Sequence, residues 1–379
     1  MKVLVVSNDF PPRVGGINYY VDQIFRRFGE GEVVVVAPAE DGAEEFDSTW
    51  PHPIERWSGR TLVPEPRLLR FLVDVTRRHR PDLVVFGALV PFGVLGRPLE
   101  RITGVPYGGF SHGVELSATR IPGCRIPMRM IGRHARFVTA VSRWTMGELR
   151  PYFGEGPRYE LLPAGIDEVE FRPGLDTAYL RERYGLDGRP VITCVSRLVE
   201  RKGQDRLIEA LPSVQREVPG AQLLIVGGGH YEAELRTMAA ASPSRDDITF
   251  AGEVPYDELA GHFAVGDVLA VPCRHRLLGL EVEALGAVFL QAAAVGRPSL
   301  GGRVGGVPDA LLHGRTGLLV DPHDTIAIAD GLVSILSDPD RAQRMGEFGA
   351  SWVHRDLTWD AIADRLAKLL ADLGPWSRP

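Results

Sequence analysis

Short apolar segments alternate with amphipathic helical segments along this chain, and this alternation constrains the fold more than any other feature. Residues 2–6, 32–37 and 81–86 are rich in valine and leucine and apolar on both faces, as buried parallel strands are. Helical patterns over residues 17–28 and 68–79 follow two of them. This order predicts an α/β fold in which a doubly wound sheet forms a Rossmann-like domain.

The alternation stops and then restarts, which indicates two domains. Residues 163–174 are turn-rich and lack apolar periodicity, and strand and helix patterns resume between residues 191 and 271. A chain of 379 residues also exceeds what one hydrophobic core usually supports. We therefore expect an N-terminal domain over residues 1–167 and a C-terminal domain over residues 168–355.

Composition and charge exclude several classes of protein. A net charge of -6 argues against a general nucleic-acid binder, which needs a basic surface. Cys124, Cys194 and Cys273 are far apart and lack metal-ligand spacing, so we interpret them as core thiols and expect no metal. We expect neither a secretory segment nor a membrane-spanning helix, because the N-terminal apolar run and the longest uncharged apolar run are both too short. We expect a cytoplasmic protein, and its oligomeric state stays open.

One stretch, residues 272–312, combines carboxylates with two glycine turns. Gly286 precedes an apolar helical run, and Gly305 with Gly306 precedes a second predicted helix start. Helix N-termini offer unpaired N–H groups and a partial positive charge to an anion. Glu283 and Gln291 flank the first turn, and such a loop glutamate is by itself more often a surface residue. The two turns together predict a phosphorylated ligand.

Cations and a histidine follow predicted strands at their carboxyl ends, where α/β sheets bind ligands. Arg197 and Lys202 follow the strand 191–195 and can form a pyrophosphate clamp, or else a solvated loop. His112 follows the strand 105–110, and a lone histidine in such a place is more often structural.

Three further sequence patterns can each be interpreted as functional or as purely structural. The GxSxG match at Ser111 lacks the other parts of a hydrolase triad, and the DxD match at Asp338 fits a turn between helices. A basic stripe at helical spacing could meet an anionic membrane or an acidic acceptor, or be a solvated face; its members are Arg125, Arg129, Arg133 and Arg136.

Several segments together resemble the retaining glycosyltransferase family 4, and within it the phosphatidylinositol mannoside mannosyltransferase branch. The segments are SNDFPPRVGGINYYV, SHGVE, AVSRWT, LLPAGID, SRLVERKGQD, LLIVGGG and EALGAVFLQAAAVGRPSLGGRVGGVPDAL. They cover nearly the whole chain and stand in the order that the family has. Each motif alone is weak, but the combination is specific.

The resemblance implies the GT-B fold, with two Rossmann-like domains facing across a central cleft. The N-terminal domain would bind the acceptor, the C-terminal domain would bind the nucleotide sugar, and residues 356–379 would cross back to the N-terminal domain. The reaction would move a mannose-like hexose from a GDP or UDP sugar to a hydroxyl of a glycolipid, cyclitol or secondary metabolite. It would need no metal or other cofactor, and contact with the inner face of the membrane would be peripheral.

The resemblance also assigns residue roles. The catalytic residues would be His112, Arg197, Lys202 and Glu283, of which Glu283 resembles the first glutamate of the E-x7-E motif. Donor binding would involve Gly15, Gly16, Arg197, Lys202, Val254, Glu283, Gln291 and the backbone amides of Phe289 and Leu290. The acceptor or membrane side would include Asp9, Arg125, Arg129 and Arg133. The leaving phosphate would help to deprotonate the acceptor, with Asp9 as an alternative base.

Gln291 departs from the family pattern, which has a second glutamate at this position for the ribose hydroxyls. An amide offers one acceptor and one donor, so donor affinity should fall by about 1–2 kcal/mol. The departure keeps two alternatives open, a nucleotide-sugar-binding protein without turnover and a sugar-nucleotide epimerase of the same fold. A pyridoxal-dependent phosphorylase would need a Schiff-base lysine, for which the second domain offers only Lys202.

Overall fold

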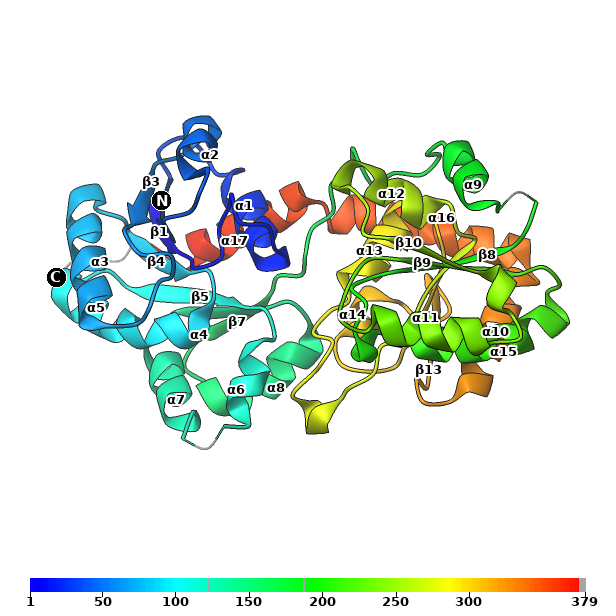
Figure 1. Cartoon of the computed structure of the whole chain (residues 1–379). Coiled ribbons are helices and arrows are strands. Elements are labelled where there is room, and N and C mark those ends of the chain that lie inside the picture. The colour runs from blue at the N-terminus through cyan, green and yellow to red at the C-terminus, as the bar shows by residue number, and fades with distance from the viewer. Residues whose placement is uncertain (122, 187, 375–379) are drawn as a thin grey trace. The chain divides into compact units, whose positions relative to one another are not determined.

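The computed structural model describes residues 1–121, 123–186 and 188–374, which divide into two compact units. The first unit contains Met1–Gly165 and the C-terminal segment from Trp359, and the second contains Ile166–Thr358. Residues 375–379 of the predicted N-terminal domain lie outside the described part. Helices cover both faces of the sheet in each unit (Figure 1).

The first unit is built on a parallel sheet that has seven strands among the described residues, in the order β3-β2-β1-β4-β5-β6-β7. The strands β1, β2 and β4 are buried along their whole length, as expected of apolar runs in the middle of a parallel sheet. The elements are β1 (Val3–Val6), α1 (Gly16–Phe25), β2 (Val33–Pro38), α2 (Ala43–Thr49), β3 (Ile54–Trp57), α3 (Pro66–His79), β4 (Leu83–Phe86), α4 (Leu89–Phe92), α5 (Gly96–Thr103), β5 (Tyr107–Ser111), α6 (Glu115–Thr119), α7 (Arg125–His134), β6 (Phe137–Ala140), α8 (Arg143–Phe153), β7 (Arg158–Leu161) and α17 (Trp359–Asp372).

The second unit repeats this architecture with a parallel sheet of six described strands, in the order β10-β9-β8-β11-β12-β13. Its central strands β8 and β11 are fully buried. The elements are α9 (Ala178–Tyr184), β8 (Val191–Val195), the 3-10 turn η2 (Glu200–Lys202), α10 (Gln204–Glu217), β9 (Gln222–Val226), α11 (Glu232–Ala241), β10 (Ile248–Gly252), α12 (Tyr256–Ala264), β11 (Val268–Val271), α13 (Ala287–Ala294), β12 (Ser299–Gly302), α14 (Val307–Ala310), β13 (Gly317–Val320), α15 (Thr325–Leu336) and α16 (Pro339–Asp356).

One sequence-based expectation for a helix is wrong, and the helix start predicted after Gly305–Gly306 is confirmed but belongs to a short helix. The basic helix α7 ends at His134, so Arg136 does not share its face. The Arg136 amide instead donates to the Tyr107 carbonyl at 2.8 Å, because the chain has already turned toward β6. The helix after Gly305–Gly306 is α14, which has only four residues, because Leu311 already leaves the helical conformation.

The last helix packs in the first unit, against α1. The rings of Tyr19 and Trp359 meet edge to face with centroids 5.6 Å apart, and Arg27 forms an ion pair of 2.5 Å with Asp360. An apolar face of α17 that includes Leu366 is buried. This packing ties the end of the described chain to the helix that Gly15–Gly16 open.

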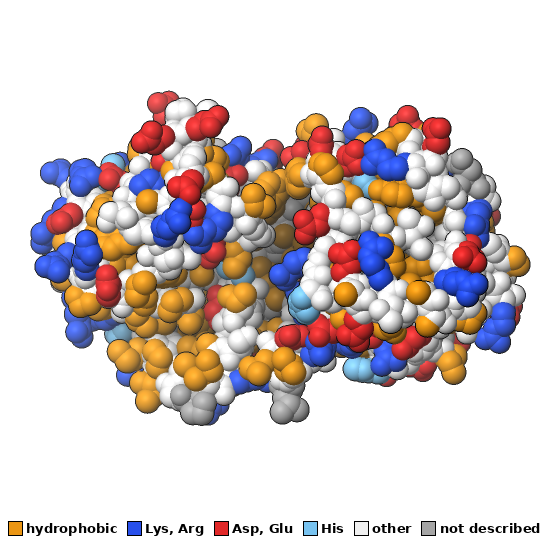
Figure 2. Space-filling model, in the orientation of Figure 1, with side chains coloured by type: hydrophobic (Ala, Val, Ile, Leu, Met, Phe, Trp, Pro, Cys, Tyr) orange, Lys and Arg blue, Asp and Glu red, His pale blue; other side chains and the backbone are white. Residues whose placement is uncertain are grey.

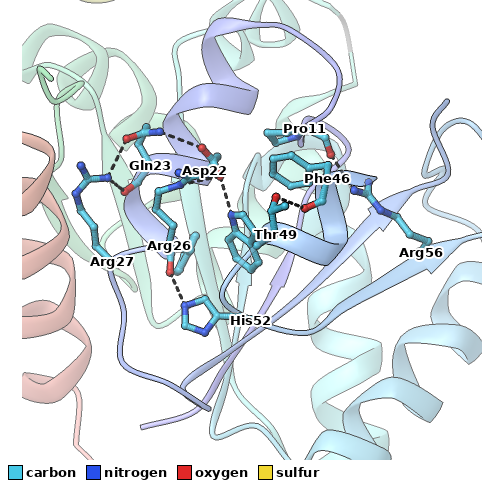
Figure 3. A network of polar contacts seen from close by, with 11 residues as sticks. Pro11, Asp22, Gln23, Arg26, Arg27, Phe46, Thr49, His52 and Arg56 are labelled. Carbon is cyan, nitrogen blue, oxygen red and sulfur yellow. Dashed lines mark hydrogen bonds and ion pairs between the residues drawn. The ribbon is translucent and has the colours of Figure 1, made fainter. Parts of the chain in front are cut away.

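A polar network fixes α1 on its other side, against the segment around α2 and β3 (Figure 3). The buried Asp22 carboxylate accepts from the Trp50 indole Nε1 at 2.7 Å and from Arg26 at 2.9 Å. His52 is hydrogen-bonded through Nε2 to the Phe25 carbonyl at 3.1 Å. These bonds hold α1 in position while its N-terminal glycines stay accessible.

Candidate active site

The loop after β8 carries the two cations that the sequence predicts, but it places them differently. Lys202 is buried in the turn η2, whereas the Arg197 side chain is exposed. Gly203 follows with a φ of 79°, and a Cβ there would lie 2.4 Å from the Pro272 carbonyl oxygen. Only glycine fits this position, and it brings the loop against the segment that begins at Pro272.

Glu283 is the centre at which the predicted residues meet. Its Oε2 lies 2.7 Å from the Lys202 Nζ and 2.5 Å from the Arg201 Nη1. The Cys273 thiol also contacts this oxygen, at 3.5 Å. The structure therefore brings Lys202 and Glu283 together, although they are far apart in the chain.

The charges of this cluster balance each other. Burial alone would raise the pKa of Glu283, but the charges of Lys202 and Arg201 outweigh it and lower this pKa to about 2. Burial works against the charge on Lys202 as well, and the Glu283 carboxylate nevertheless raises the Lys202 pKa. Both groups are therefore ionised at neutral pH. Two cations share one carboxylate, so the cluster keeps positive charge that an anionic ligand can neutralise.

The two glycine turns hold the backbone of Glu283. The Gly306 amide donates to the Glu283 carbonyl at 2.9 Å, and a Cβ on Gly305 would lie 2.2 Å from that carbonyl oxygen. Gly286, with a φ of 83°, forms the N-cap of α13. The glycines thus serve first to position Glu283 and to start the helix behind it.

The amides at the start of α13 differ from the expectation. The Phe289 amide already donates to the Gly286 carbonyl at 3.0 Å, so it is not free to face a phosphate. In a regular helix the Leu290 amide also has a partner inside the helix. The first-turn positions without an intrahelical acceptor are Ala287 and Val288, and they are the better candidates.

Three of the predicted donor residues line one pocket of about 350 Å³, namely Arg197, Val254 and Gln291. The rest of its wall is mostly apolar or backbone, including Val195, Gly228 and Val288. An apolar pocket with a few polar groups at its rim suits a flat ring that carries hydrogen-bonding edges. The pocket also joins the α13 N-terminus to the loop after β8.

The sequence reasoning missed Arg201 and the buried ion pair between Arg274 and Asp205. Arg274 makes a two-pronged contact with the Asp205 carboxylate, at 2.9 and 2.8 Å, and the Arg274 amide donates to the Arg201 carbonyl at 2.9 Å. In the sequence these residues look like ordinary loop and helix charges. The one sequence feature that could have indicated them is their position, because Arg201 and Asp205 stand near Lys202 in the chain and Arg274 stands in the segment after β11.

In the first unit, His112 follows β5 and is partly buried. Its Nε2 lies 2.7 Å from the Gly87 carbonyl oxygen, and its ring packs edge to face on Tyr20 of α1 with centroids 5.0 Å apart. Because a carbonyl only accepts, Nε2 carries the proton. Burial lowers the pKa of His112 to about 4, so the ring is neutral at pH 7 and Nδ1 presents a lone pair.

The Ser111 hydroxyl is part of a structural motif. It donates to Glu115 Oε2 at 2.9 Å, and the Gly113 amide donates to the same oxygen at 2.9 Å. Both side chains are buried, and burial raises the pKa of Glu115. These bonds shape the loop that carries His112, and they leave Ser111 unsuited to act as a nucleophile.

The loop after β1 holds the remaining candidates of this unit. Gly16 begins α1, and a Cβ added there would meet nothing within 4 Å. The fold therefore does not itself require glycine at this position. Asp9 is half-buried, and burial raises its pKa although Arg13 opposes this shift.

Basic and apolar side chains alternate on the exposed face of α7. Arg125, Arg129 and Arg133 are exposed, and Ile126 and Met130 are 69% and 62% exposed. Hydrophobic side chains gather on the lower side of this unit in Figure 2. Within the described ranges, no helix has the length and apolarity to span a bilayer, and no group of three or more His, Cys, Asp or Glu is arranged to hold a metal ion.

The chain matches two family profiles in succession. Residues 14–170 match "Glycosyltransferase Family 4", and residues 177–352 match "Glycosyl transferases group 1". The first match lies mostly in the first unit and the second lies within the second unit.

Similar proteins are found along the full length. A protein of Mycolicibacterium smegmatis named GDP-mannose-dependent alpha-(1-6)-phosphatidylinositol monomannoside mannosyltransferase is 41% identical, over 97% of this chain and 98% of that protein. A Corynebacterium glutamicum protein named for the monoacylated form of the same acceptor is 35% identical, over 97% of each chain. The crystal structure of HepE from Anabaena in complex with UDP has a TM-score of 0.82 at 20% identity, over 98% of this chain and 100% of that one.

The likeness to the solved structure establishes the fold, and the likeness in sequence establishes the family. The chain belongs to the retaining glycosyltransferase family 4 and has the GT-B fold.

Proposed function

We propose that this enzyme transfers mannose from GDP-mannose to a hydroxyl of a phosphatidylinositol mannoside glycolipid. The full-length likeness to proteins named for this reaction supports the choice of donor and acceptor. The observation that carries the proposal is the cluster of Lys202, Arg201 and Glu283 beside the pocket lined by Arg197 and Gln291. Together they offer cations for a diphosphate and a pocket for a base.

In this proposal the second unit holds the donor. Lys202 and Arg197 bind the diphosphate, the amides of Ala287 and Val288 add hydrogen bonds, and the guanine lies in the pocket beside Val254. Gln291 takes the ribose hydroxyls. As charge develops on the leaving GDP, the fixed cations stabilise it, which lowers the barrier.

The chemistry is a substitution at the front face of the sugar. The bond between mannose C1 and the phosphate oxygen breaks, the acceptor oxygen bonds to C1 on the same face, and the acceptor proton moves to the leaving phosphate. No separate metal or cofactor takes part in this scheme. In the first unit, the neutral His112 accepts a hydrogen bond from a sugar hydroxyl through Nδ1, and Gly15 and Gly16 let the backbone approach the donor. Asp9 is the alternative base, since burial raises its pKa and makes the carboxylate a stronger base.

We also propose that α7 rests on the membrane that contains the acceptor. Arg125, Arg129 and Arg133 would meet anionic headgroups while Ile126 and Met130 enter the interface. Replacing Ile126 and Met130 together with Ser should reduce cosedimentation with phosphatidylinositol vesicles and leave GDP binding unchanged. Equal cosedimentation of variant and wild type would exclude α7 as the contact.

A thermal-shift panel tests the donor assignment. GDP and GDP-mannose should raise the melting temperature more than UDP, ADP and their sugars, because a ligand of the folded state stabilises it. Lys202→Ala should remove most of this shift and abolish transfer, whereas Lys368→Ala on α17 is the matched control and should behave as wild type. A larger shift with UDP-sugars, or full activity of Lys202→Ala, would refute the assignment.

The alternative of a binding protein without turnover is favoured by one observation, the amide of Gln291 in the donor pocket. It predicts a normal thermal shift with GDP-mannose and neither transfer nor donor hydrolysis. An epimerase would instead convert the free donor without any acceptor.

A further inference from the structure

Another pocket, of about 510 Å³, lies in the first unit and is lined mainly by cationic side chains. Its wall includes four arginines against one glutamate, Glu100. The arginines, with the histidine that accompanies them, are Arg97, Arg133, His134, Arg136 and Arg158. This concentration of positive charge stands out in a chain whose net charge is -6.

This arginine pocket lies at the amino ends of the strands, whereas His112 lies at their carboxyl ends. Arg136 directly precedes β6 and Arg158 begins β7, and the Arg158 amide donates to the Arg136 carbonyl at 3.0 Å. Both therefore stand at the amino ends of parallel strands. His112 follows the carboxyl end of β5, so the arginine pocket is not part of that site.

Several carboxylates contact the arginines of this pocket. Glu100 contacts Arg97 at 2.9 Å and Arg136 at 3.4 Å, and Arg158 lies 3.3 Å from Asp372 and 3.8 Å from Glu160. The Arg97 Nε is nevertheless buried without a hydrogen-bond partner among the described residues. A buried N–H of this kind is costly unless an acceptor arrives.

The positive charges around the pocket also affect the pKa of His134. Burial, and then the charges of Arg97, Arg101 and Arg133, lower the pKa of His134, and Glu100 is the one carboxylate that opposes them. An anion in the pocket would reverse this effect.

We propose that the arginine pocket binds a phosphate group, either free phosphate or the phosphodiester of a lipid headgroup. Guanidinium groups match the tetrahedral oxygens of phosphate in paired hydrogen bonds, which favours phosphate over a monovalent halide. Arg97 and Arg158 approach it from α5 and from the start of β7. None of the residues that line this pocket is among those proposed to bind the donor.

The test follows His134 by proton NMR while inorganic phosphate is added, so that phosphate bound by Lys202 and Arg197 does not contribute to the signal. Phosphate should raise the His134 pKa and shift its resonance to saturation. Arg97→Gln and Arg158→Gln should each weaken this binding by at least about tenfold, since each loses a charge-assisted contact. Arg101→Gln removes the same charge from α5 without lining the pocket, and should retain the affinity within about twofold.

Vesicles then distinguish the source of the phosphate. If the ligand is a headgroup, vesicles that contain phosphatidylinositol should bind wild type better than Arg158→Gln, and inorganic phosphate should compete. Free phosphate as the ligand predicts the NMR response with equal vesicle binding of both proteins. A His134 resonance that phosphate does not move, or an equal loss in Arg101→Gln, would overturn the proposal.

Discussion

Glu283 shows how one residue can organise a site. Its side chain neutralises part of the charge of Lys202 and Arg201, and its carbonyl anchors the Gly305–Gly306 turn. Removing the carboxylate would leave two buried or half-buried cations without their main partner. Such a loss typically costs about 3–5 kcal/mol, more than the ion pair contributes in net terms.

The low pKa of Glu283 makes acid stability a direct test. A carboxyl whose folded pKa is about 2 stabilises the native state above its usual pKa of 4.5, and this stabilisation is lost as the pH falls from 4.5 toward 2. The free energy of unfolding of wild type, measured with urea, should therefore decrease as the pH falls across this range. Glu283→Gln should be less stable at pH 7 and depend less on pH in the same range. Asp246→Asn, at a 91% exposed side chain, is the control and should follow wild type.

Gln291 sets the second residue-scale prediction, because it lines the proposed base and ribose pocket. Gln291→Glu should strengthen GDP binding by about 1–2 kcal/mol, since a carboxylate accepts hydrogen bonds from both ribose hydroxyls. Calorimetric titration with GDP measures the change, and 2′,3′-dideoxy-GDP is the control ligand that should show no gain. An unchanged affinity for GDP would place the ribose elsewhere.

At the scale of elements, helix α1 is held from two sides so that its N-terminus is fixed. Trp50 binds Asp22 on one side of the helix, and Trp359 and Asp360 of α17 contact the other side. Helix packing explains why the end of the chain returns to the first unit. The helix start itself keeps space beside Gly16, which the fold alone does not require.

This space leads to a prediction for Gly16→Ala. The variant should fold as stably as wild type, because a Cβ there meets nothing and alanine favours a helix. Its transfer activity should fall about tenfold or more if the donor approaches this backbone. Gly147→Ala on α8, where an added Cβ also meets nothing, should keep both stability and activity. Normal activity of Gly16→Ala would remove Gly16 from the donor site.

At the scale of the whole molecule, each unit has its own buried sheet and its own set of candidate groups. The second unit alone contains Arg197, Lys202, Glu283 and Gln291. It should therefore keep much of the donor affinity on its own.

A fragment of residues 166–358 tests this division. It should unfold cooperatively and show a thermal shift with GDP, because its core and its cationic cluster are complete. The same fragment with Lys202→Ala is the control and should lose the shift. A fragment that folds but ignores GDP would mean that donor binding depends on residues of the first unit.

The sequence predicted the architecture well because its signal is repetitive. Strands such as Val191–Val195 and Val268–Val271 are continuous apolar runs, and the first of them has the predicted bounds. The edge strand Ile54–Trp57 was missed, because its half-buried residues include two charges and show no apolar run.

The site was predictable only in part. Lys202 and Glu283 stand in recognisable segments, and their pairing follows from the order of strands β8 and β11. Arg201 and Arg274 could not be identified, because an arginine that pairs inside a fold looks like a solvated one in the sequence. The Phe289 amide is predicted to face a phosphate, but in the structure it donates to the carbonyl of the N-cap residue Gly286. The sequence does not show this hydrogen bond.

The most direct test of the central claim is the transfer reaction itself, followed by NMR of the new linkage. Purified enzyme, GDP-mannose and phosphatidylinositol monomannoside should give a product with one more mannose in the α configuration, which is retained from the donor. Lys202→Ala should give none. Three results would contradict a retaining mannosyl transfer centred on the Lys202 and Glu283 cluster. They are a β-linked product, release of free mannose without any transfer, and transfer by Lys202→Ala at the wild-type rate.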